Sequence, residues 1–358
     1  MRRTPALIVG GGPAGAAAAI TLARAGTPHL LIERTRETGD ALCGGFLSWR
    51  TLGTLAALGI DATTLNPAPI TKVRILSGTR TVEAALPAPA LAVSRRRLDT
   101  LLLARAARAG AAIEHGVTVR AIEDRHARTA DGATIAADTL FLASGKHDIR
   151  GVSRPETARG EDPTLGIRLR LPASPSLTRA IGDAVELHLF TGGYVGIALQ
   201  EDGHVNLCMA VRRSVMQAAG DPSALLRLLG DAHPALGERL AGWDGHAPDA
   251  IANVPYGWYA RTTQAGTFRL GDQAGVIPSL AGEGMGIALA SGSAAARAYT
   301  RGEPASRWQS RFARSLARPI GAASLLRHLA ESRHAPAVLP LLRPTLIRIG
   351  AALTRIGD

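Results

Sequence analysis

Cysteine, lysine and aromatic residues are all scarce in this chain of 358 residues. Its two cysteines, Cys43 and Cys208, lie far apart in the sequence and cannot form a disulfide framework, so we expect a reducing, cytoplasmic environment. No uninterrupted apolar run reaches the roughly 18 residues that a membrane-spanning helix needs. We see no internal repeat, and we predict no metal site.

Acidic residues are also few, and the positive charge is unevenly distributed. The formal net charge is +12, of which +7 lies in residues 301–358 and only +5 in the first 300 residues. This distribution argues against nucleic acid as a partner. The arginines of the C-terminal stretch are Arg301, Arg307, Arg311, Arg314, Arg318, Arg327, Arg333, Arg343, Arg348 and Arg355.

The most informative stretch lies near the N-terminus. An apolar run at residues 6–9 is followed at once by a glycine-rich turn, and residues 16–24 then have the pattern of an apolar helix. Gly10 permits a sharp turn, Gly12 lets the backbone approach a pyrophosphate, and Gly15 allows close packing of helix and strand. The phosphates would lie at the helix N-terminus.

A second apolar run completes this unit. Residues 29–32 end in Glu33, about 20 residues beyond the glycines, where a carboxylate can accept hydrogen bonds from an adenosine ribose. The succession of strand, turn, helix, strand and acid predicts a dinucleotide site. Arg2-Arg3 before an apolar stretch is similar to an export signal, but the glycines and Pro13 interrupt that stretch, so we interpret it as mature protein.

Two further stretches complete a pattern that suits one cofactor. One is Arg95-x-x-Leu-Asp99 at the start of a predicted helix, and the other is residues 271–278, Gly-Asp-Gln-Ala-Gly-Val-Ile-Pro, with Gly-Glu-Gly-Met at 282–285. With the glycine turn, they make residues 1 to about 300 resemble the FAD-dependent oxidoreductases that have the para-hydroxybenzoate hydroxylase type of fold. That family includes aromatic monooxygenases, flavin halogenases and geranylgeranyl reductases.

The resemblance implies a role for each motif. Asp272 is expected to bond the ribityl chain of FAD, Pro278 to lie against the isoalloxazine, and Arg95 to approach the cofactor. Backbone N–H groups of residues 282–285 would face the N1–C2 carbonyl region of the flavin, where negative charge accumulates on reduction. The predicted cofactor-binding residues are Gly10, Gly12, Pro13, Ala14, Gly15, Glu33, Arg34, Cys43, Arg95, Gly145, Gly271, Asp272, Pro278, Gly282, Gly284 and Met285.

The implied fold is α/β, with a Rossmann-like FAD-binding domain of the glutathione reductase type interleaved with a β-sheet substrate domain. We assign residues 1–70, 94–160 and 266–300 to the first, 71–93 and 161–265 to the second, and 301–358 to C-terminal helices. Predicted helices are 49–58, 94–109, 222–240 and 282–298. Predicted strands are 71–76, 81–86, 117–122, 134–135, 138–143, 166–171, 184–190, 194–199, 204–211 and 267–270.

The chain departs from its relatives at several motifs. Where the family usually has Ala-Asp-Gly, this chain has Ala-Ser144-Gly145, which leaves the mode of NAD(P)H use open. Of the Tyr-x-Trp-x-Phe-Pro motif of geranylgeranyl reductases only Tyr194 is present, whereas the Cys43-Gly-Gly loop is similar to theirs. The halogenase signature Trp-x-Trp-x-Ile-Pro is absent, and we interpret Lys72 as a solvated lysine.

Few side chains are candidates for contact with a substrate. Tyr194, Tyr256 and Trp258 are a large share of the aromatic residues and are predicted to line a substrate pocket, with packing in the core as the open alternative. His147 and Asp148 are better explained as an exposed turn than as an acid and a base. We therefore name no catalytic residue.

The C-terminal stretch carries an amphipathic pattern. In residues 345–357, Leu346, Ile349, Leu353 and Ile356 share one helical face, and Arg348 and Arg355 lie opposite. Two interpretations remain open. The helix either lies on an anionic membrane or packs on the FAD-binding domain.

The preferred hypothesis is a NAD(P)H-dependent flavoprotein monooxygenase that uses O₂ to hydroxylate a hydrophobic, phenolic or polyketide-like small molecule. The alternative is an isoprenoid or polyprenyl double-bond reductase similar to geranylgeranyl reductases. A third is a non-catalytic or electron-transfer flavoprotein.

Overall fold

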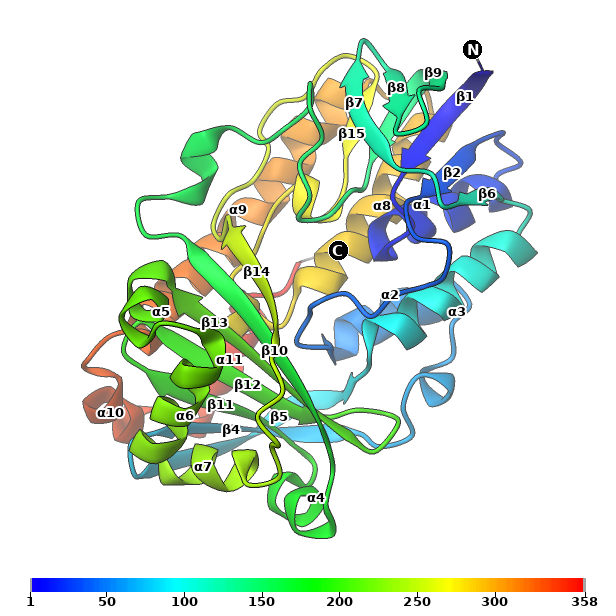
Figure 1. Cartoon of the computed structure of the whole chain (residues 1–358). Helices are drawn as coiled ribbons and strands as arrows, with labels where there is room; N and C mark the ends of the chain where they lie inside the picture. The colour runs from blue at the N-terminus through cyan, green and yellow to red at the C-terminus, as the bar shows by residue number, and fades with distance from the viewer. Residues whose placement is uncertain (1, 357–358) are drawn as a thin grey trace.

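The computed structural model describes residues 2–356. Met1, at the start of the predicted FAD-binding domain, and residues 357–358, at the end of the predicted C-terminal region, lie outside it. Within this range the chain forms one sheet of seven strands and one of eight, at opposite ends of the molecule (Figure 1). Helix α9 runs from the first sheet towards the second and is followed there by α10 and α11 (Figure 1). The predicted α/β fold class is confirmed.

The seven-stranded sheet has the order β6-β2-β1-β9-β8-β7, with β15 paired to β9. Its strands β6, β2, β1, β9 and β15 are parallel, and β8 is antiparallel to both of its neighbours, β9 and β7. The strands are β1 (Arg2–Val9), β2 (Leu30–Glu33), β6 (Ala112–His115), β7 (Val119–Glu123), β8 (His126–Thr129), β9 (Thr134–Leu142) and β15 (Thr267–Arg269).

Helices α1 (Pro13–Arg24), α3 (Arg95–Arg108) and α8 (Gly284–Thr300) contribute most of the core beside this sheet. The turn between β1 and α1 is tight: Gly10 has φ +109°, and a Cβ on Gly15 would lie 1.9 Å from the Gly10 carbonyl oxygen. Only glycine allows this approach. The predicted unit of strand, turn and helix is therefore present, with the helix N-terminus directly behind the sheet edge.

The eight-stranded sheet has the order β14-β10-β13-β12-β11-β4-β5-β3. Its neighbours are antiparallel except β11 and β4, which pair in parallel where two distant stretches of chain meet. The strands are β3 (Phe46–Leu47), β4 (Ile70–Ser77), β5 (Arg80–Ala92), β10 (Thr164–Pro172), β11 (Ala184–Phe190), β12 (Gly193–Leu199), β13 (His204–Arg212) and β14 (Asp249–Val254). Strand β3 belongs here although its residues lie in the first stretch assigned to the FAD-binding domain.

Helices cover both faces of this second sheet. On one face a core cluster joins the sheet to α4 (Pro175–Ile181), α5 (Arg213–Ala219), α6 (Pro222–Ala232) and α7 (Pro234–Leu240). The single helix predicted over 222–240 is wrong, because Pro234 begins a new helix after α6 ends. The remaining helix beside the first sheet is α2 (Trp49–Ala57).

The C-terminal region is more regular than its sequence indicated. Helix α9 (Ala305–Ala330) is 26 residues long, and its Trp308 stacks on Phe312 and packs beside Phe268 of β15. The shorter α10 (Ala335–Val338) and α11 (Pro344–Leu353) follow, and α11 packs against β5. The C-terminal region thus joins the first sheet to the second.

Candidate functional site

Two helix N-termini provide free backbone donors. Neither α1 nor α8 has a side-chain hydrogen bond from its N-cap residue or an acidic residue in its first turn. The N–H groups of a first turn have no partner within the helix, so an uncapped end is ready to bind an anion. These two ends suit the pyrophosphate and the N1–C2 region of FAD, which were predicted to lie there.

Glu33 lies beside the glycine turn, as its position at the end of β2 predicted. One carboxylate oxygen accepts a hydrogen bond of 2.6 Å from the Gly11 N–H, and the other accepts from the Thr35 N–H at 3.0 Å. These bonds orient the carboxylate at the edge where the adenosine half of a dinucleotide would lie. The neighbouring Arg34 is exposed.

Arg95 brings a half-buried positive charge to the same turn. Its guanidinium bonds both oxygens of Asp99, at 3.0 and 2.7 Å, and a Cβ on Gly12 would lie 3.2 Å from its Nη2. Burial by itself would lower the pKa of Arg95, but the adjacent Asp99 carboxylate outweighs it and the pKa of Arg95 is raised. The guanidinium therefore remains charged next to the predicted pyrophosphate position.

Two residues that the sequence analysis missed hold the Gly145 loop against the Asp272 loop. Arg154 donates to the carbonyl oxygens of Asp272 (3.1 Å) and Lys146 (2.6 Å), and Gln273 donates to that of Gly145 (2.9 Å). Arg154 belongs to no periodic pattern or recognised motif, and Gln273, although it lies within the 271–278 motif, was given no function there. Their function becomes visible only because the fold brings these two loops together.

Asp148 and His147 have the structural explanation that we preferred. The Asp148 carboxylate forms a 3.0 Å ion pair with Arg154, and the His147 carbonyl accepts a hydrogen bond from Gln273. The pKa of His147 is lowered by burial and by the nearby Arg34. Both residues therefore stabilise the loop.

The predicted isoalloxazine end contains a buried ion pair that the sequence did not reveal. Glu283, between Gly282 and Gly284, is 2% exposed, accepts a 3.0 Å bond from the Ser48 hydroxyl, and lies 3.2 Å from the Arg355 guanidinium. Burial raises the pKa of Glu283, and the Arg355 charge opposes this shift. Pro278 and Met285 are buried at this end, and Gly284 is exposed.

The position of Arg355 corrects the amphipathic pattern predicted for the C-terminus. Arg355 is 7% exposed and lies over the Trp49 ring at 5.1 Å, whereas Arg348 is exposed. Ile356 packs against the core beside α1 and α8, and Leu353 is half-buried. The pattern failed because the chain past α11 turns inward to the start of α8.

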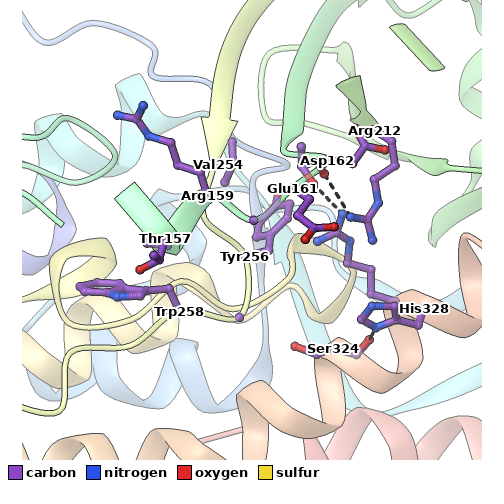
Figure 2. A pocket seen from close by; sticks show the side chains of 15 residues that line it. Thr157, Arg159, Glu161, Asp162, Arg212, Val254, Tyr256, Trp258, Ser324 and His328 are labelled. Atoms are coloured by element: carbon purple, nitrogen blue, oxygen red, sulfur yellow. Dashed lines mark hydrogen bonds between the residues drawn. The ribbon is translucent and has the colours of Figure 1, made fainter. Parts of the chain in front are cut away.

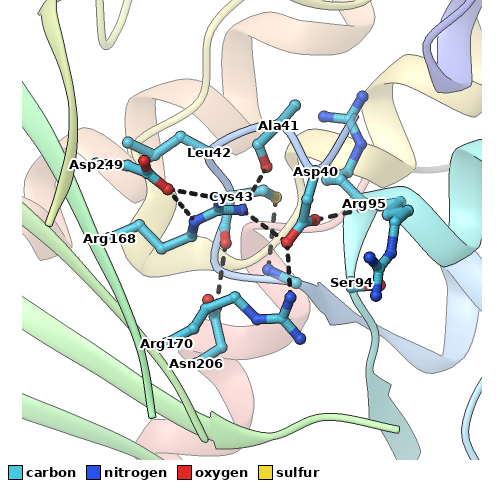
Figure 3. Close-up of polar contacts among 12 residues, drawn as sticks. Asp40, Ala41, Leu42, Cys43, Ser94, Arg95, Arg168, Arg170, Asn206 and Asp249 are labelled. Atoms are coloured by element: carbon cyan, nitrogen blue, oxygen red, sulfur yellow. Dashed lines mark hydrogen bonds and ion pairs between the residues drawn. The ribbon is translucent and has the colours of Figure 1, made fainter. Parts of the chain in front are cut away.

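The Cys43 loop is tied to the second sheet by polar side chains (Figure 3). Arg168 and Arg170 form ion pairs with Asp40 at 3.1 and 3.2 Å, and the Asn206 amide donates to the carbonyl oxygen of Cys43 at 3.1 Å. The thiol of Cys43 accepts from the Gly45 N–H. This loop therefore connects the predicted cofactor region to the substrate sheet.

An apolar pocket of about 270 Å³ lies between the second sheet and the C-terminal helices. Ser279 and Gly282, which follow the predicted isoalloxazine contact Pro278, also line it. The side chains that line its walls are almost entirely apolar and include Val73, Ile75, Val185, Leu187, Leu189, Leu326, Leu329 and Leu346.

Three hydroxyl groups form a hydrogen-bonded cluster at this pocket. Tyr194 Oη and Tyr256 Oη lie 2.6 and 2.8 Å from Ser279 Oγ, and the Leu280 N–H donates to Tyr194 Oη at 2.8 Å. Burial raises the pKa of Tyr194 to about 12 and raises that of Tyr256 as well, so both stay protonated at neutral pH. Two of the three predicted substrate residues are thus brought together by Ser279, which was not predicted.

Trp258, the third predicted substrate residue, faces a different cavity. This polar cavity, of about 390 Å³, is lined by Trp258, Tyr256, Arg159, Asp162 and Arg212 (Figure 2). Arg154 lies 5.8 Å from the Trp258 ring centroid. Tyr256 is therefore the side chain shared between the polar cavity and the hydroxyl cluster of the apolar pocket.

Among residues 2–356, no group of three or more His, Cys, Asp or Glu side chains is placed to hold a metal ion. Both cysteines are free thiols, and burial raises the pKa of Cys208 to about 12. The polar side chains that the structure does bring together here are the hydroxyls of Tyr194, Tyr256 and Ser279 and the ion pair of Glu283 and Arg355.

Comparison with known proteins bears on the predicted cofactor. Residues 3–150 match a family model described as FAD binding domain, which supports FAD. A Mycolicibacterium smegmatis protein named menaquinone reductase is 27% identical over 374 residues, which cover 98% of this chain and 90% of that protein.

Solved structures show the same fold across the whole chain. A flavoprotein/dehydrogenase of Cytophaga hutchinsonii has a TM-score of 0.80 at 17% identity, covering 99% of this chain and 93% of that one. Pseudomonas aeruginosa PqsL, in complex with 2-aminobenzoylacetate, has a TM-score of 0.74 at 16% identity, with coverage of 95% and 100%. A geranylgeranyl bacteriochlorophyll reductase-like protein of Thermoplasma acidophilum has a TM-score of 0.67 at 20% identity, with coverage of 100% and 94%.

Proposed function

The chain belongs to the FAD-dependent oxidoreductases with the para-hydroxybenzoate hydroxylase type of fold, and we propose that it reduces a double bond in an isoprenoid chain, such as that of a menaquinone. The observation that carries the proposal is the apolar pocket, which runs from the predicted isoalloxazine end to exposed leucines. The relative named menaquinone reductase favours the same choice. The monooxygenase that the sequence analysis preferred becomes the second candidate.

The composition of the pocket supports a long hydrocarbon substrate. Its volume, about 270 Å³, is near the lower end of ligand sites, and it opens past Leu326, Leu329 and Leu346, each at least 37% exposed. A phenolic substrate would need several polar partners to orient its ring. An isoprenoid chain needs none along its length, and part of it can remain outside the pocket.

The Ser279 cluster supplies the proton that such a reduction requires. Bound FAD, when reduced, supplies a hydride to one carbon of the double bond, and the other carbon must receive a proton. The three hydroxyl groups carry three protons, and the two hydrogen bonds between them use two of these protons. The third proton is therefore free to be donated into the pocket. Ser279 Oγ faces the pocket and is the proposed donor.

Tyr256 provides a route by which that proton is replaced. Its hydroxyl donates to Ser279 Oγ, and its side chain also lines the polar cavity. A proton passed from Tyr256 to Ser279 can therefore be replaced from water in that cavity. Replacement from the polar cavity does not require water to enter along the apolar walls of the pocket.

The test is turnover under nitrogen with chemically reduced, FAD-loaded enzyme and a menaquinone that has an unsaturated polyprenyl tail. The product is then exposed to air, which reoxidises the ring but not a saturated tail. We expect a lasting gain of two hydrogens in the tail, seen by mass spectrometry. Product that forms only with O₂ and contains labelled oxygen would overturn the proposal in favour of monooxygenation.

Monooxygenation keeps one specific observation in its favour. Around Tyr194 the chain has Gly196 and Leu199 where geranylgeranyl reductases have tryptophan and proline.

NAD(P)H remains the proposed reductant for either reaction. Anaerobic mixing with NADH and with NADPH, followed through the loss of flavin absorbance, identifies which of the two reduces the enzyme.

A further inference from the structure

Exposed leucines gather at the mouth of the apolar pocket. Of the eight large hydrophobic side chains exposed within residues 2–356, seven lie between positions 325 and 349. They form what we call the leucine surface: Leu325, Leu326, Leu329, Val338, Leu341, Leu346 and Ile349. Four of them also line the pocket, so the surface is continuous with its interior. Soluble proteins rarely expose so concentrated an apolar patch without a partner.

The exposed charges of the stretch that carries this surface have one sign. Between residues 304 and 356 the only carboxylate is that of Glu331, which is 7% exposed and pairs with Arg212 and Arg327. Arg318, Arg333, Arg343 and Arg348 are exposed in the same stretch. An apolar patch on a stretch whose exposed charged side chains are all basic is complementary to a bilayer of anionic lipid.

Two short helices of this region meet at a sharp bend. Within the described chain no single helix is long and apolar enough to cross a bilayer, and only the bent pair Ala335–Leu341 and Pro344–Leu353, at 108°, reaches that composition. Short apolar helices of this kind can bury their exposed side chains among the acyl chains while the arginines contact the headgroups.

We propose that the leucine surface docks on anionic membranes and that the pocket opens into the hydrocarbon layer there. An isoprenoid tail would then enter the pocket without crossing water. The docking face is broader than the helical stripe predicted from the sequence, since it combines residues of α9, α10 and α11, whereas Arg355 is buried and Ile356 packs against the core. The substrate entry step rests on the proposed function, whereas the docking itself does not.

The test is co-sedimentation of the full-length FAD-loaded protein with vesicles of phosphatidylcholine, with and without phosphatidylglycerol. The variant is Leu325→Glu with Leu341→Glu, because these are the two most exposed leucines, at 64% and 73%, and neither lines the pocket. We expect binding to anionic vesicles to fall at least tenfold while FAD content stays unchanged. The matched control is Leu228→Glu on α6, which is 57% exposed but outside the leucine surface.

Other outcomes separate the alternatives. Wild-type protein that ignores anionic vesicles at low salt would overturn the docking proposal. So would a dimer in solution that the double variant dissociates, since the surface would then join two copies of the chain. Reduction of a menaquinone tail in detergent micelles without vesicle binding would overturn docking alone. Vesicle binding without any such reduction would leave docking standing and remove the proposed function.

Discussion

The cofactor end and the substrate end of this protein are built in different ways. The cofactor end consists mainly of backbone: the turn at Gly10 and Gly15, and the uncapped N-termini of α1 and α8. The substrate end consists of apolar side chains from two faces that meet across a pocket. A site made of backbone can be disrupted by the single carbon that a substituted glycine adds, whereas the shape of a pocket lined by apolar side chains changes gradually with each substitution. The four predictions below test this difference.

The largest effect is expected from Gly15→Val. A Cβ at this position would lie 1.9 Å from the Gly10 carbonyl oxygen, so the turn cannot keep its shape. We expect the variant to lose bound FAD, measured by flavin absorbance of the purified protein. Gly53→Ala is the control, because it lies in α2 with no atom within 4 Å of the new Cβ, and it should retain FAD. Full FAD content in Gly15→Val would contradict the backbone explanation.

Ser279→Ala should slow reduction without affecting the cofactor. Removal of a positioned proton donor commonly costs about 100-fold or more in rate. We expect that loss in the anaerobic single-turnover rate, with unchanged FAD content and with recovery in Ser279→Thr, which keeps the hydroxyl. Ser310→Ala, on the exposed side of α9, serves as the control. An unchanged rate in Ser279→Ala would exclude this hydroxyl as the donor.

Gly196→Leu should narrow the pocket and change substrate preference. A Cβ there would make only ordinary contacts of 3.7 and 3.9 Å, so the protein should fold, while the rest of the leucine side chain enters the pocket. We expect KM for a long-tailed substrate to rise about tenfold, and KM for a short-tailed analogue to change little. Gly321→Ala in α9, with open space around it, is the control. Equal effects on both substrates would argue against the tail lying beside Gly196.

The smallest effect on activity is expected from a substitution near Glu186, on the face of β11 opposite to the pocket. There Glu186 is fully buried and bonds Arg239 at 2.9 and 3.0 Å, while Leu187 on the same strand lines the pocket. Burial would raise the pKa of Glu186, but hydrogen bonds from His188 and Arg239 hold it at about 2. Since this pKa is below the ordinary value, the stabilisation is complete above about pH 5 and is lost as the pH falls towards 2.

Arg239→Met tests this charge cluster. It removes one partner of a buried carboxylate, which typically costs about 3 kcal/mol in the free energy of unfolding, and it should move acid unfolding to higher pH. Urea unfolding at pH 7 and pH 4 measures both effects, with FAD content and turnover at pH 7 largely kept. The control is Arg179→Met on the nearby α4, for which no ion pair is found within residues 2–356. Equal stability of Arg239→Met and wild type would show that Arg74 and His188 suffice for Glu186.

The substrate region shows where prediction from the sequence stopped. The strands at 184–190, 194–199 and 204–211 were predicted almost to the residue, because alternating apolar residues and glycine turns are local signals. Their pairing partners were not, and β11 pairs in parallel with β4, more than a hundred positions away. Likewise residues 301–358 were predicted to be helical, but the bounds of α9 were not, because its apolar positions are interspersed with arginines that become either buried or exposed only after packing.

What the sequence determined by itself was the cofactor end. The glycine turn, Glu33 and the start of α8 depend on backbone conformation within a few residues, and such requirements are visible in residue type and spacing. Only the tertiary structure decided the substrate end. Tyr194 and Ser279 are hydrogen-bonded although they are 85 positions apart in the sequence, and Glu283 and Arg355 form an ion pair across a similar distance in the sequence. Long-range contacts of this kind leave no periodic signal, because each partner is chosen by the packing of whole sheets and helices.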